Sequence, residues 1–296
     1  MKSLEIPAHA KINFGLRVMG LRDDHYHDIS SVMIKVLLCD TIRITAQEKI
    51  SSRAALKVTT DNPSIPEGED NIAYQAADAF FSALRDAFGF DVTIRIKKRI
   101  PHGAGLGGGS SDAATVLQAL NSLLPMDQNM SRAKLIEIGA SVGSDVPFFL
   151  RGHACIVSGR GEQLREIDLK HSLFLVCCMP HDRLSTRDVY RLYDMVGSST
   201  SPDIQAIASA LEAGCLESAC GSVANDLEKA AVRLSPAISR IKQELHATGP
   251  LCVSMSGSGS CVYAVYADVA QARHAYRQVR DKDFIRWSKL TKSLTR

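Results

Sequence analysis

The sequence lacks long hydrophobic runs and any strong excess of charge, and each absence excludes a class of protein. No apolar stretch approaches the roughly 18 residues that a membrane-spanning helix needs. The opening segment, MKSLEIPAHAKINFGL, lacks the apolar core of a signal peptide. A formal net charge of +3 is too small to indicate a nucleic-acid partner. We therefore expect a soluble cytoplasmic protein with no membrane and no nucleic acid among its partners.

Paired cysteine motifs are also missing. The eight cysteines form no C-x-x-C pair, which excludes a zinc ribbon and a thioredoxin-like redox motif. Cys177 and Cys178 are adjacent within an apolar run. This placement predicts small buried side chains in a reducing compartment.

Charge is uneven only at the C-terminal end. Its last eleven residues hold four cations and no acid: Arg286, Lys289, Lys292 and Arg296. We expect a solvated terminal helix or tail, and contact with an anionic ligand or partner is the alternative.

Length and periodicity predict a two-domain α+β protein. The 296 residues, with 45% hydrophobic and 23% charged side chains, suit two globular domains. Apolar periodicity predicts strands at 90–97, 173–179 and 261–266. It predicts helices at 71–88, 111–124, 131–142, 203–213, 223–233, 236–249 and 268–282. Strands and helices mix in both halves, and we place the domain boundary near residue 160.

A glycine-rich segment follows the first predicted strand. Five glycines fall within seven residues (Gly103, Gly105, Gly107, Gly108 and Gly109), so backbone amides can approach a ligand closely. The helix that follows offers unpaired N–H groups and the positive end of its dipole. Ser110 and Ser111 add hydroxyl groups for phosphate or for magnesium. The segment therefore predicts a phosphate site, because a simple turn between strand and helix would need fewer glycines.

Two other phosphate-binding motifs fit less well. A Walker loop requires a lysine after the glycines, and none is present. The Rossmann pattern G-x-G-x-x-G matches literally at 103–108. That fold also requires a second strand soon after the helix, ending in an acidic residue. Here the helix runs into Pro125 and then another helical pattern, which disfavours a dinucleotide site.

Three motifs in order resemble those of the GHMP kinases. The segment GAGLGGGSSDAA (103–114) resembles their phosphate loop, and AKINFGL (10–16) and SMSGSGS (254–260) resemble their other two motifs. The resemblance implies an ATP-binding N-terminal domain (1–160) and a substrate-binding C-terminal domain (161–296), with the active site in the cleft between them. It also implies ATP and Mg²⁺ as cofactors and a small-molecule alcohol as substrate. The protein would be a monomer or a homodimer.

Further segments are similar to one branch of that family. They are KIN (11–13), YH (26–27), GSDVPF (143–148), GRGE (159–162) and NDLE (225–228). The branch phosphorylates a hydroxyl of a cytidine-diphosphate sugar alcohol in the non-mevalonate isoprenoid pathway. One departure is His25, where the branch usually has glycine, a residue that adopts the left-handed backbone region without strain.

The resemblance implies roles for three residues around the reacting hydroxyl. Asp145 would be the catalytic base, and Lys11 would pair with it, lower its pKa and stabilise the transferring phosphoryl group. Asn13 would share a strand face with Lys11 and lie near the substrate. From the residues alone, Asp145 in Gly-Ser-Asp-x-Pro could be a turn or capping residue. Lys11 could equally be an edge lysine whose ammonium reaches solvent.

The resemblance also implies ligand contacts. On the nucleotide side they are the phosphate loop (Gly103, Gly105, Leu106, Gly107, Gly108, Gly109, Ser110, Ser111) and, near adenine, Asn71 and Lys98. On the substrate side they are Tyr26, His27, Thr186 and Tyr190 around cytidine, and Gly257, Ser258 and Gly259 near the phosphates or the erythritol part.

The same residues also admit structural roles. Asn71 could start a helix, Lys98 could be a solvated lysine at a strand end, and residues 257–259 could be a tight turn. Tyr26 and His27 could be surface loop residues. The pair His25-x-His27 lacks an evident third ligand, so we predict no metal site at that pair.

Two other functions remain open from sequence. A homoserine or mevalonate kinase would share the family motifs, although the Tyr-His pair and Gly-Ser-Asp-Val-Pro disfavour that substrate choice. A non-catalytic nucleotide-binding regulator on the same fold would not need both Lys11 and Asp145.

Overall fold

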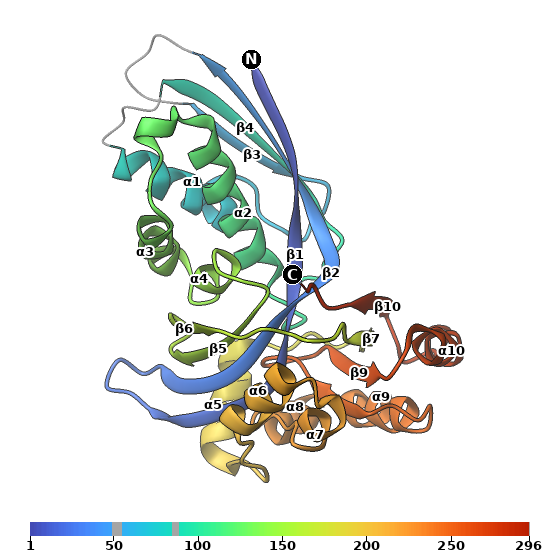
Figure 1. Ribbon diagram of the computed structural model, residues 1–296. Coiled ribbons are helices and arrows are strands. Elements are labelled where there is room, and N and C mark those ends of the chain that lie inside the picture. The colour runs from blue at the N-terminus through green and yellow to red at the C-terminus, as the bar shows by residue number, and fades with distance from the viewer. Residues whose placement is uncertain (49–54, 85–88, 296) are drawn as a thin grey trace. The chain divides into compact units, whose positions relative to one another are not determined.

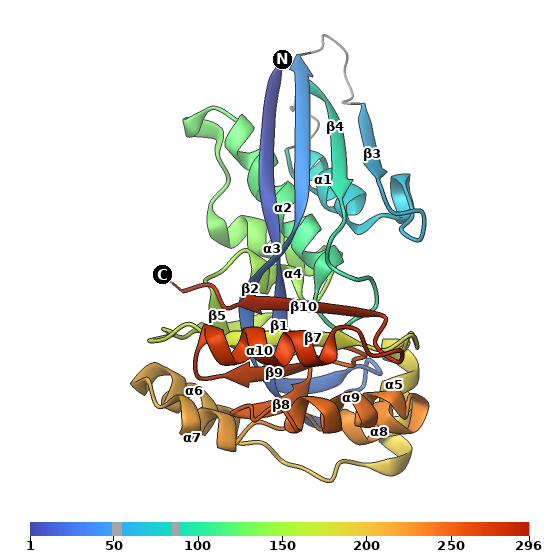
Figure 2. The ribbon, with the colours of Figure 1, turned by 90° about the vertical axis from the view of Figure 1, so that its right-hand side faces the viewer.

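The computed structural model describes residues 1–48, 55–84 and 89–295, which form two compact units (Figures 1 and 2). The first unit comprises Met1–Ala10, Leu38–His102 and Gly107–Gly152, and the second comprises Lys11–Leu37, Gly103–Leu106 and His153–Arg296. The boundaries fall within the long strands β1 (Lys2–Leu21) and β2 (His27–Glu48). The single division at residue 160 stays a prediction, and two N-terminal segments fold with the second unit.

The first unit is a sheet covered by helices on one side (Figure 1). Strand β3 (Leu56–Thr60) runs parallel to β4 (Phe90–Lys97), which pairs antiparallel with the last part of β2. The helices are α1 (Ile72–Ala83), α2 (Gly108–Leu123), α3 (Arg132–Val142) and α4 (Val146–Phe149), with short 3₁₀ turns η1 (Gly68–Asp70) and η2 (Met126–Gln128).

Alternation along β4 explains how this sheet packs. Val92, Ile94 and Ile96 are buried, and Arg95 and Lys97 are exposed, which confirms the predicted period-two strand. The even-numbered side chains therefore face the core of the unit, and the odd-numbered ones face solvent.

Helix α1 starts where the sequence predicts it. Asn71 caps it by accepting a hydrogen bond of 2.9 Å from Ala73 N. The helix buries residues at helical spacing: Ala73, Ala76, Ala77, Phe80 and Phe81. It ends at Ala83, and residues 85–88 of the predicted helix lie outside the described residues.

Helix α2 begins three residues earlier than predicted, at Gly108. Its N-cap, Gly107, has a φ of 70° in the left-handed region that glycine adopts without strain. The bend brings the glycine-rich segment directly into the first helical turn, where Ser111 N donates a 2.9 Å hydrogen bond to Gly107 O.

The second unit is built on an antiparallel sheet in the order β10-β7-β9-β8. Its strands are β7 (Phe174–Met179), β8 (Cys252–Met255), β9 (Val262–Tyr266) and β10 (Trp287–Lys292). The adjacent cysteines Cys177 and Cys178 are buried in β7, as predicted. Helices α9 (Ala237–His246) and α10 (Val269–Val279) pack on the sheet.

Further elements of the second unit flank this sheet. Strands β5 (Ala154–Gly159) and β6 (Gln163–Glu166) form an antiparallel hairpin, and β5 pairs with the start of β2. The remaining helices are α5 (Thr186–Val196), α6 (Ile204–Ala213), α7 (Leu216–Gly221) and α8 (Glu228–Leu234). Among the helices that the structure describes, none combines the length and hydrophobicity that crossing a lipid bilayer requires.

Two predictions for the second unit are wrong. The basic C-terminal segment is not a solvated helix or tail, because residues 287–292 form β10 and pair with β7, a buried strand that needs backbone partners. Arg296 lies outside the described residues. The helix predicted from residue 223 begins only at Glu228, because Asn225 turns the chain and its side-chain oxygen accepts from Leu227 N at 3.0 Å.

Candidate active site

The three motif segments meet in the second unit. Lys11 N donates to Leu106 O at 2.9 Å, and Cys261 N donates to Ala104 O at 3.2 Å. The hydroxyl of Ser256 donates to Gly105 O at 2.8 Å. The first half of the glycine-rich segment is therefore held between β1 and the 256–260 loop by backbone groups.

Lys11 and Asn13 form the centre of this framework. Lys11 Nζ donates to Asn13 Oδ1 at 2.6 Å, so the two side chains share a strand face as predicted. Both are buried, with 4% and 1% exposure, which excludes a solvent-reaching edge lysine. Asn13 Nδ2 donates to Ser31 Oγ at 2.8 Å, which fixes the amide and leaves its oxygen for the ammonium.

Two glycines make close contacts between these segments. A Cβ atom on Gly105 would lie 2.1 Å from the backbone oxygen of Ser256, and Gly105 also has a φ of +72°. A Cβ on Gly257 would lie 3.2 Å from Asn13 Oδ1. Asn225 Nδ2 holds the second loop by donating to Met255 O and Gly257 O, both at 2.8 Å. The 256–260 loop is therefore more than a tight turn, since it packs against the buried polar centre.

His27 and Tyr190, both predicted to contact the cytidine ring, lie together. Their rings stack with centroids 4.8 Å apart. His27 Nε2 lies 2.7 Å from Asp194 Oδ1, and the Tyr193 ring stands edge-on at 6.1 Å. These contacts hold the His27 imidazole against helix α5. His27 is therefore not a surface loop residue without partners.

The remaining predicted substrate residues fall into two groups. Thr186 Oγ1 lies 2.9 Å from Ser258 Oγ, which joins the start of α5 to the 256–260 loop. Tyr26 points elsewhere: it is 53% exposed and lies under the guanidinium of Arg160 at 4.1 Å. The preceding His25 has a φ of 62°, the left-handed conformation that the usual glycine would adopt without strain.

In the first unit, Lys98 occupies a buried triad with two acids. Its ammonium lies 2.5 Å from Asp40 Oδ2 and 2.7 Å from Asp112 Oδ2. Asp40 Oδ1 also accepts hydrogen bonds from Arg99 N and, at 2.8 Å, from Ile100 N. Lys98 is therefore no solvated strand-end lysine. A Cβ on Gly108 would lie 3.4 Å from its ammonium, so the triad sits directly beneath the start of α2.

The triad is electrostatically unusual because two carboxylates share one cation. Burial raises the pKa of Asp112 to about 7, although Lys98 opposes the shift. Burial alone would lower the pKa of Lys98, but the two carboxylates outweigh it and raise that pKa. Asp112 Oδ1 is buried and finds no hydrogen-bond partner among the described residues. Asp112 therefore holds a proton more readily than an exposed aspartate does.

Asn71 and Asp145 take defined backbone positions in the same unit. Besides capping α1, Asn71 donates from Nδ2 to Pro66 O at 2.8 Å, so the structure gives it the helix-start role. Asp145 stands at the N-cap of α4, but its side chain makes no capping hydrogen bond, which disfavours a purely capping role. A Cβ on Gly143 would lie 4.0 Å from Ser110 Oγ, so the 143–145 segment lies against the first turn of α2.

Several site residues escaped the sequence analysis. Asp40 and Asp194 carried no motif signal, since each lies within an ordinary strand or helix. Asp112 and Asn225 stood in recognised segments but had no assigned role. Ser256 belonged to the SMSGSGS motif, where only the glycines and Ser258 were predicted to act.

Comparison with known proteins places the chain among relatives over nearly its full length. Residues 71–153 match the family model "GHMP kinases N terminal domain", and residues 196–284 match "GHMP kinases C terminal". The chain therefore belongs to the GHMP kinases. This confirms the family and the two-domain α+β fold predicted from the sequence.

Its similarity to individual proteins is more specific. A protein of Geobacter sulfurreducens named 4-diphosphocytidyl-2-C-methyl-D-erythritol kinase is 37% identical over 96% of this chain and 97% of its own length. One of the same name from Acetivibrio thermocellus is 36% identical over 96% and 97%. The crystal structure of a 4-(cytidine 5'-diphospho)-2C-methyl-D-erythritol kinase matches with a TM-score of 0.78, at 34% identity, over 98% of this chain and 100% of the other. Within the GHMP kinases, the chain belongs to the family of these proteins.

A further match concerns the fold alone. The crystal structure of a homoserine kinase from Cytophaga hutchinsonii gives a TM-score of 0.77 at 17% identity, covering 99% of this chain and 95% of the other. The architecture is therefore common to kinases with different substrates.

Proposed function

We propose that the chain transfers the terminal phosphoryl group of ATP to a hydroxyl of 4-diphosphocytidyl-2-C-methyl-D-erythritol. The relatives that carry this kinase's name are 35–38% identical over nearly the full length, which confirms the predicted kinase function. Solved structures of homoserine and mevalonate kinases match this chain at 12–17% identity, which supports a common fold but not a common substrate.

One observation carries the assignment to this site. The buried Lys11, its partner Asn13 and residues 103–106 of the glycine-rich segment are joined by hydrogen bonds within the second unit. A buried cation beside open backbone amides suits a polyphosphate, because charge-assisted hydrogen bonds strengthen where water is excluded. A non-catalytic regulator would have no need to keep the cation buried.

The residues divide the work of phosphoryl transfer. Asp145 accepts the proton of the attacking hydroxyl, and Lys11 stabilises negative charge on the transferring group. Backbone amides of residues 103–109 and the first turn of α2 bind the phosphates. Asn71 and Lys98 line the adenine side, where the triad fixes the position of Lys98.

The chain also offers suitable groups for Mg²⁺ bound with ATP. The hydroxyls of Ser110 and Ser111 lie in the first turn of α2, and the 143–145 segment beside them carries the carboxylate of Asp145. Hard oxygen donors of this kind fit Mg²⁺, which would neutralise phosphate charge when bound.

The cytidine end of the substrate falls to the group around His27. We assign base contact to the stacked rings of His27 and Tyr190, with Thr186 and Ser258 as hydroxyl donors beside them. We do not assign Tyr26 to the base, because its ring lies under the Arg160 guanidinium, apart from these rings. Gly257 and Gly259 allow the diphosphate or the erythritol part to approach the backbone.

ADP release with a panel of alcohols tests this function. We expect turnover with 4-diphosphocytidyl-2-C-methyl-D-erythritol, and at least 100-fold less with the unlinked sugar phosphate, homoserine or mevalonate, because these lack the cytidine that the His27 group binds. Turnover with another panel member would reassign the substrate, and ATP binding without any turnover would indicate the regulator.

The Asp145→Asn variant tests the base. We expect turnover to fall by a factor of roughly 10² to 10⁴ while ATP binding stays unchanged. Asp127→Asn, at an exposed acid of the same unit, is the matched control and should keep full activity. Near-normal turnover in Asp145→Asn would remove Asp145 from the mechanism.

A further inference from the structure

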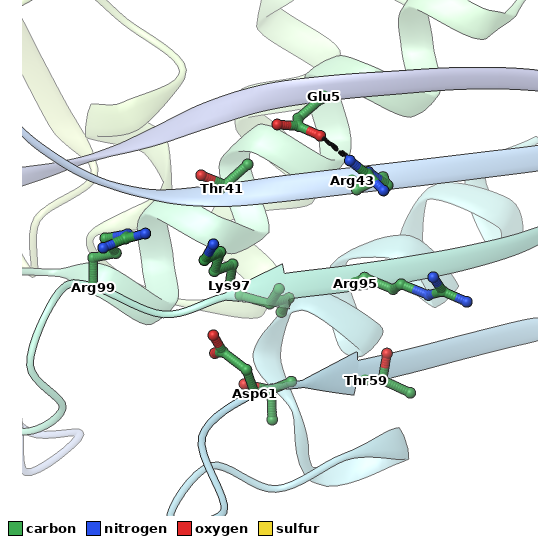
Figure 3. Close-up of a pocket in the computed structure, with 10 residues that line it drawn as sticks. Glu5, Thr41, Arg43, Thr59, Asp61, Arg95, Lys97 and Arg99 are labelled. Atoms are coloured by element: carbon green, nitrogen blue, oxygen red, sulfur yellow. Dashed lines mark hydrogen bonds and ion pairs between the residues drawn. The ribbon is translucent and has the colours of Figure 1, made fainter.

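The first unit carries a cluster of basic side chains on the solvent face of its sheet. A cavity of ≈ 520 Å³ lies across β2, β4 and the end of β3 (Figure 3). Four cations line it, Arg43, Arg95, Lys97 and Arg99, together with only two acids, Glu5 and Asp61. The lining therefore carries a net charge of +2.

Strand register brings like charges face to face in this cavity. Arg43 on β2 pairs directly with Arg95 on β4. Like charges at directly opposed positions destabilise a sheet. Lys97 follows Arg95 on the same face of β4, and both side chains are exposed. The cluster therefore opposes the stability of the sheet, which points to a role outside folding.

The two acids of the cavity are already engaged. Glu5 Oε2 accepts hydrogen bonds from both Nη2 and Nε of Arg43, at 2.6 and 3.0 Å. Asp61 Oδ1 accepts from the backbone N–H of Lys98 at 2.8 Å. Arg95 and Lys97 have no acidic partner among the residues that the structure describes. Their charge is available to a ligand.

The cavity is distinct from the groups assigned to ATP. Along β4, Ile94 and Ile96 are buried on the side of the helices, and Arg95 and Lys97 project from the opposite side (Figure 3). Lys98, the next residue, turns inward to Asp40 and Asp112 beneath α2. The sheet therefore separates the basic cavity from the first turn of α2.

We propose that this cavity binds the diphosphate group of a small molecule. Guanidinium groups match phosphate oxygens with paired N–H donors, and Arg95 and Lys97 offer two separate charges along one strand. Spaced charges of this kind suit two linked phosphates better than one. The threonines Thr41 and Thr59, paired in register with Lys97 and Arg95, add hydroxyl groups beside them. This site is additional to the proposed kinase function and does not depend on it.

Calorimetric titration with inorganic pyrophosphate tests the site. A non-hydrolysable ATP analogue is kept in excess throughout, so that the glycine-rich segment is occupied. We expect pyrophosphate to bind the wild-type protein more tightly than orthophosphate does. The variant Arg95→Gln/Lys97→Gln should bind pyrophosphate at least tenfold more weakly.

Lys57→Gln is the matched control, because Lys57 is an exposed cation of the same sheet that does not line the cavity. It should leave pyrophosphate binding unchanged. Thermal midpoints establish that each variant folds, and the single variant Lys97→Gln replaces the double one if the latter is unstable.

Two results would overturn the proposal. One is equal pyrophosphate binding in wild type and the Arg95/Lys97 variant, or no binding to wild type at all. The other is an RNA oligonucleotide that binds wild type more tightly than pyrophosphate and loses that binding in the variant, which would assign the face to nucleic acid.

Discussion

Lys98 and Asp112 face each other beneath the glycine-rich segment, with the ammonium 2.7 Å from a carboxylate oxygen. An oxygen of the Asp40 carboxylate lies 2.5 Å from the same ammonium. One buried cation therefore serves two acids. The consequence is a proton held at Asp112, since burial raises its pKa from 3.8 to about 7.

This proton makes stability depend on pH in a definite direction. Between pH 4 and 7 the unfolded chain has lost the Asp112 proton and the folded protein retains it, so the free energy of unfolding falls as the pH rises. The slope due to this group approaches about 1.4 kcal/mol per pH unit. The free energy of unfolding of Asp112→Asn, measured by urea denaturation from pH 5 to 8, should lack the decrease that this group causes.

The contrast with an exposed acid isolates the effect. Asp127→Asn should keep the wild-type pH profile, because Asp127 is exposed on the turn η2. A stability difference between wild type and Asp112→Asn that stays constant over this pH range would contradict a titrating Asp112.

Alanine substitutions at two glycines of the glycine-rich segment should differ in their effect on ATP binding. Gly103 and Gly105 have similar φ values, +69° and +72°, so alanine meets the same backbone strain at both, about 1 kcal/mol. At Gly105 the new Cβ would also lie 2.1 Å from the backbone oxygen of Ser256, while at Gly103 nothing lies within 4 Å. Gly105→Ala should therefore lose ATP binding by at least tenfold and lower the thermal midpoint.

Gly103→Ala should stay within about fivefold of wild-type ATP affinity, which fluorescence titration with a labelled ATP analogue would measure. If both variants bind ATP equally well, the close contact between Gly105 and Ser256 is not needed for the site.

The sequence predicted the elements that carry a local signal. Strand β4 and helix α1 were predictable because alternation and capping are written in consecutive residues, and the glycine segment because few other functions need so many glycines together. The polar partners of the site residues could not be predicted from the sequence. Asp194 meets His27 across 167 positions of the chain, and its own segment is an ordinary amphipathic helix. Strand β10 was missed because its pairing with β7 is set by tertiary packing rather than by its basic composition.

Relief of like charge should stabilise the first unit. Arg95 faces Arg43 in register, so Arg95→Thr removes a repulsion and places a β-branched residue on the exposed face of β4. We expect the free energy of unfolding to rise by about 0.2–1 kcal/mol at low salt. Denaturation at low and high salt checks this, since the gain should shrink as salt screens the charges.

Lys57→Thr on the neighbouring strand is the comparison, because Lys57 pairs with the uncharged Thr93. It removes a cation without relieving a directly opposed pair. An equal gain in both variants would attribute the effect to strand propensity instead of charge.

Asp194 should act on substrate affinity rather than on turnover. Its carboxylate holds His27 at 2.7 Å while the imidazole stacks on Tyr190, so Asp194→Ala releases the ring that we assign to cytidine. Loss of such a hydrogen bond costs about 1 kcal/mol, which corresponds to roughly a fivefold higher KM for the cytidine substrate. The value of kcat should change little, because we assign the reacting hydroxyl to Asp145 and Lys11.

Asp188→Ala provides the control on the same helix. Asp188 is exposed in the first turn of α5, where a carboxylate favours the positive end of the helix dipole, so its removal weakens the helix start without releasing His27. Steady-state kinetics should therefore show a raised KM for Asp194→Ala alone. A parallel fall in kcat in the Asp194 variant would place His27 near the transferred phosphoryl group instead of the cytidine ring, because only contacts that strengthen in the transition state alter kcat in that way.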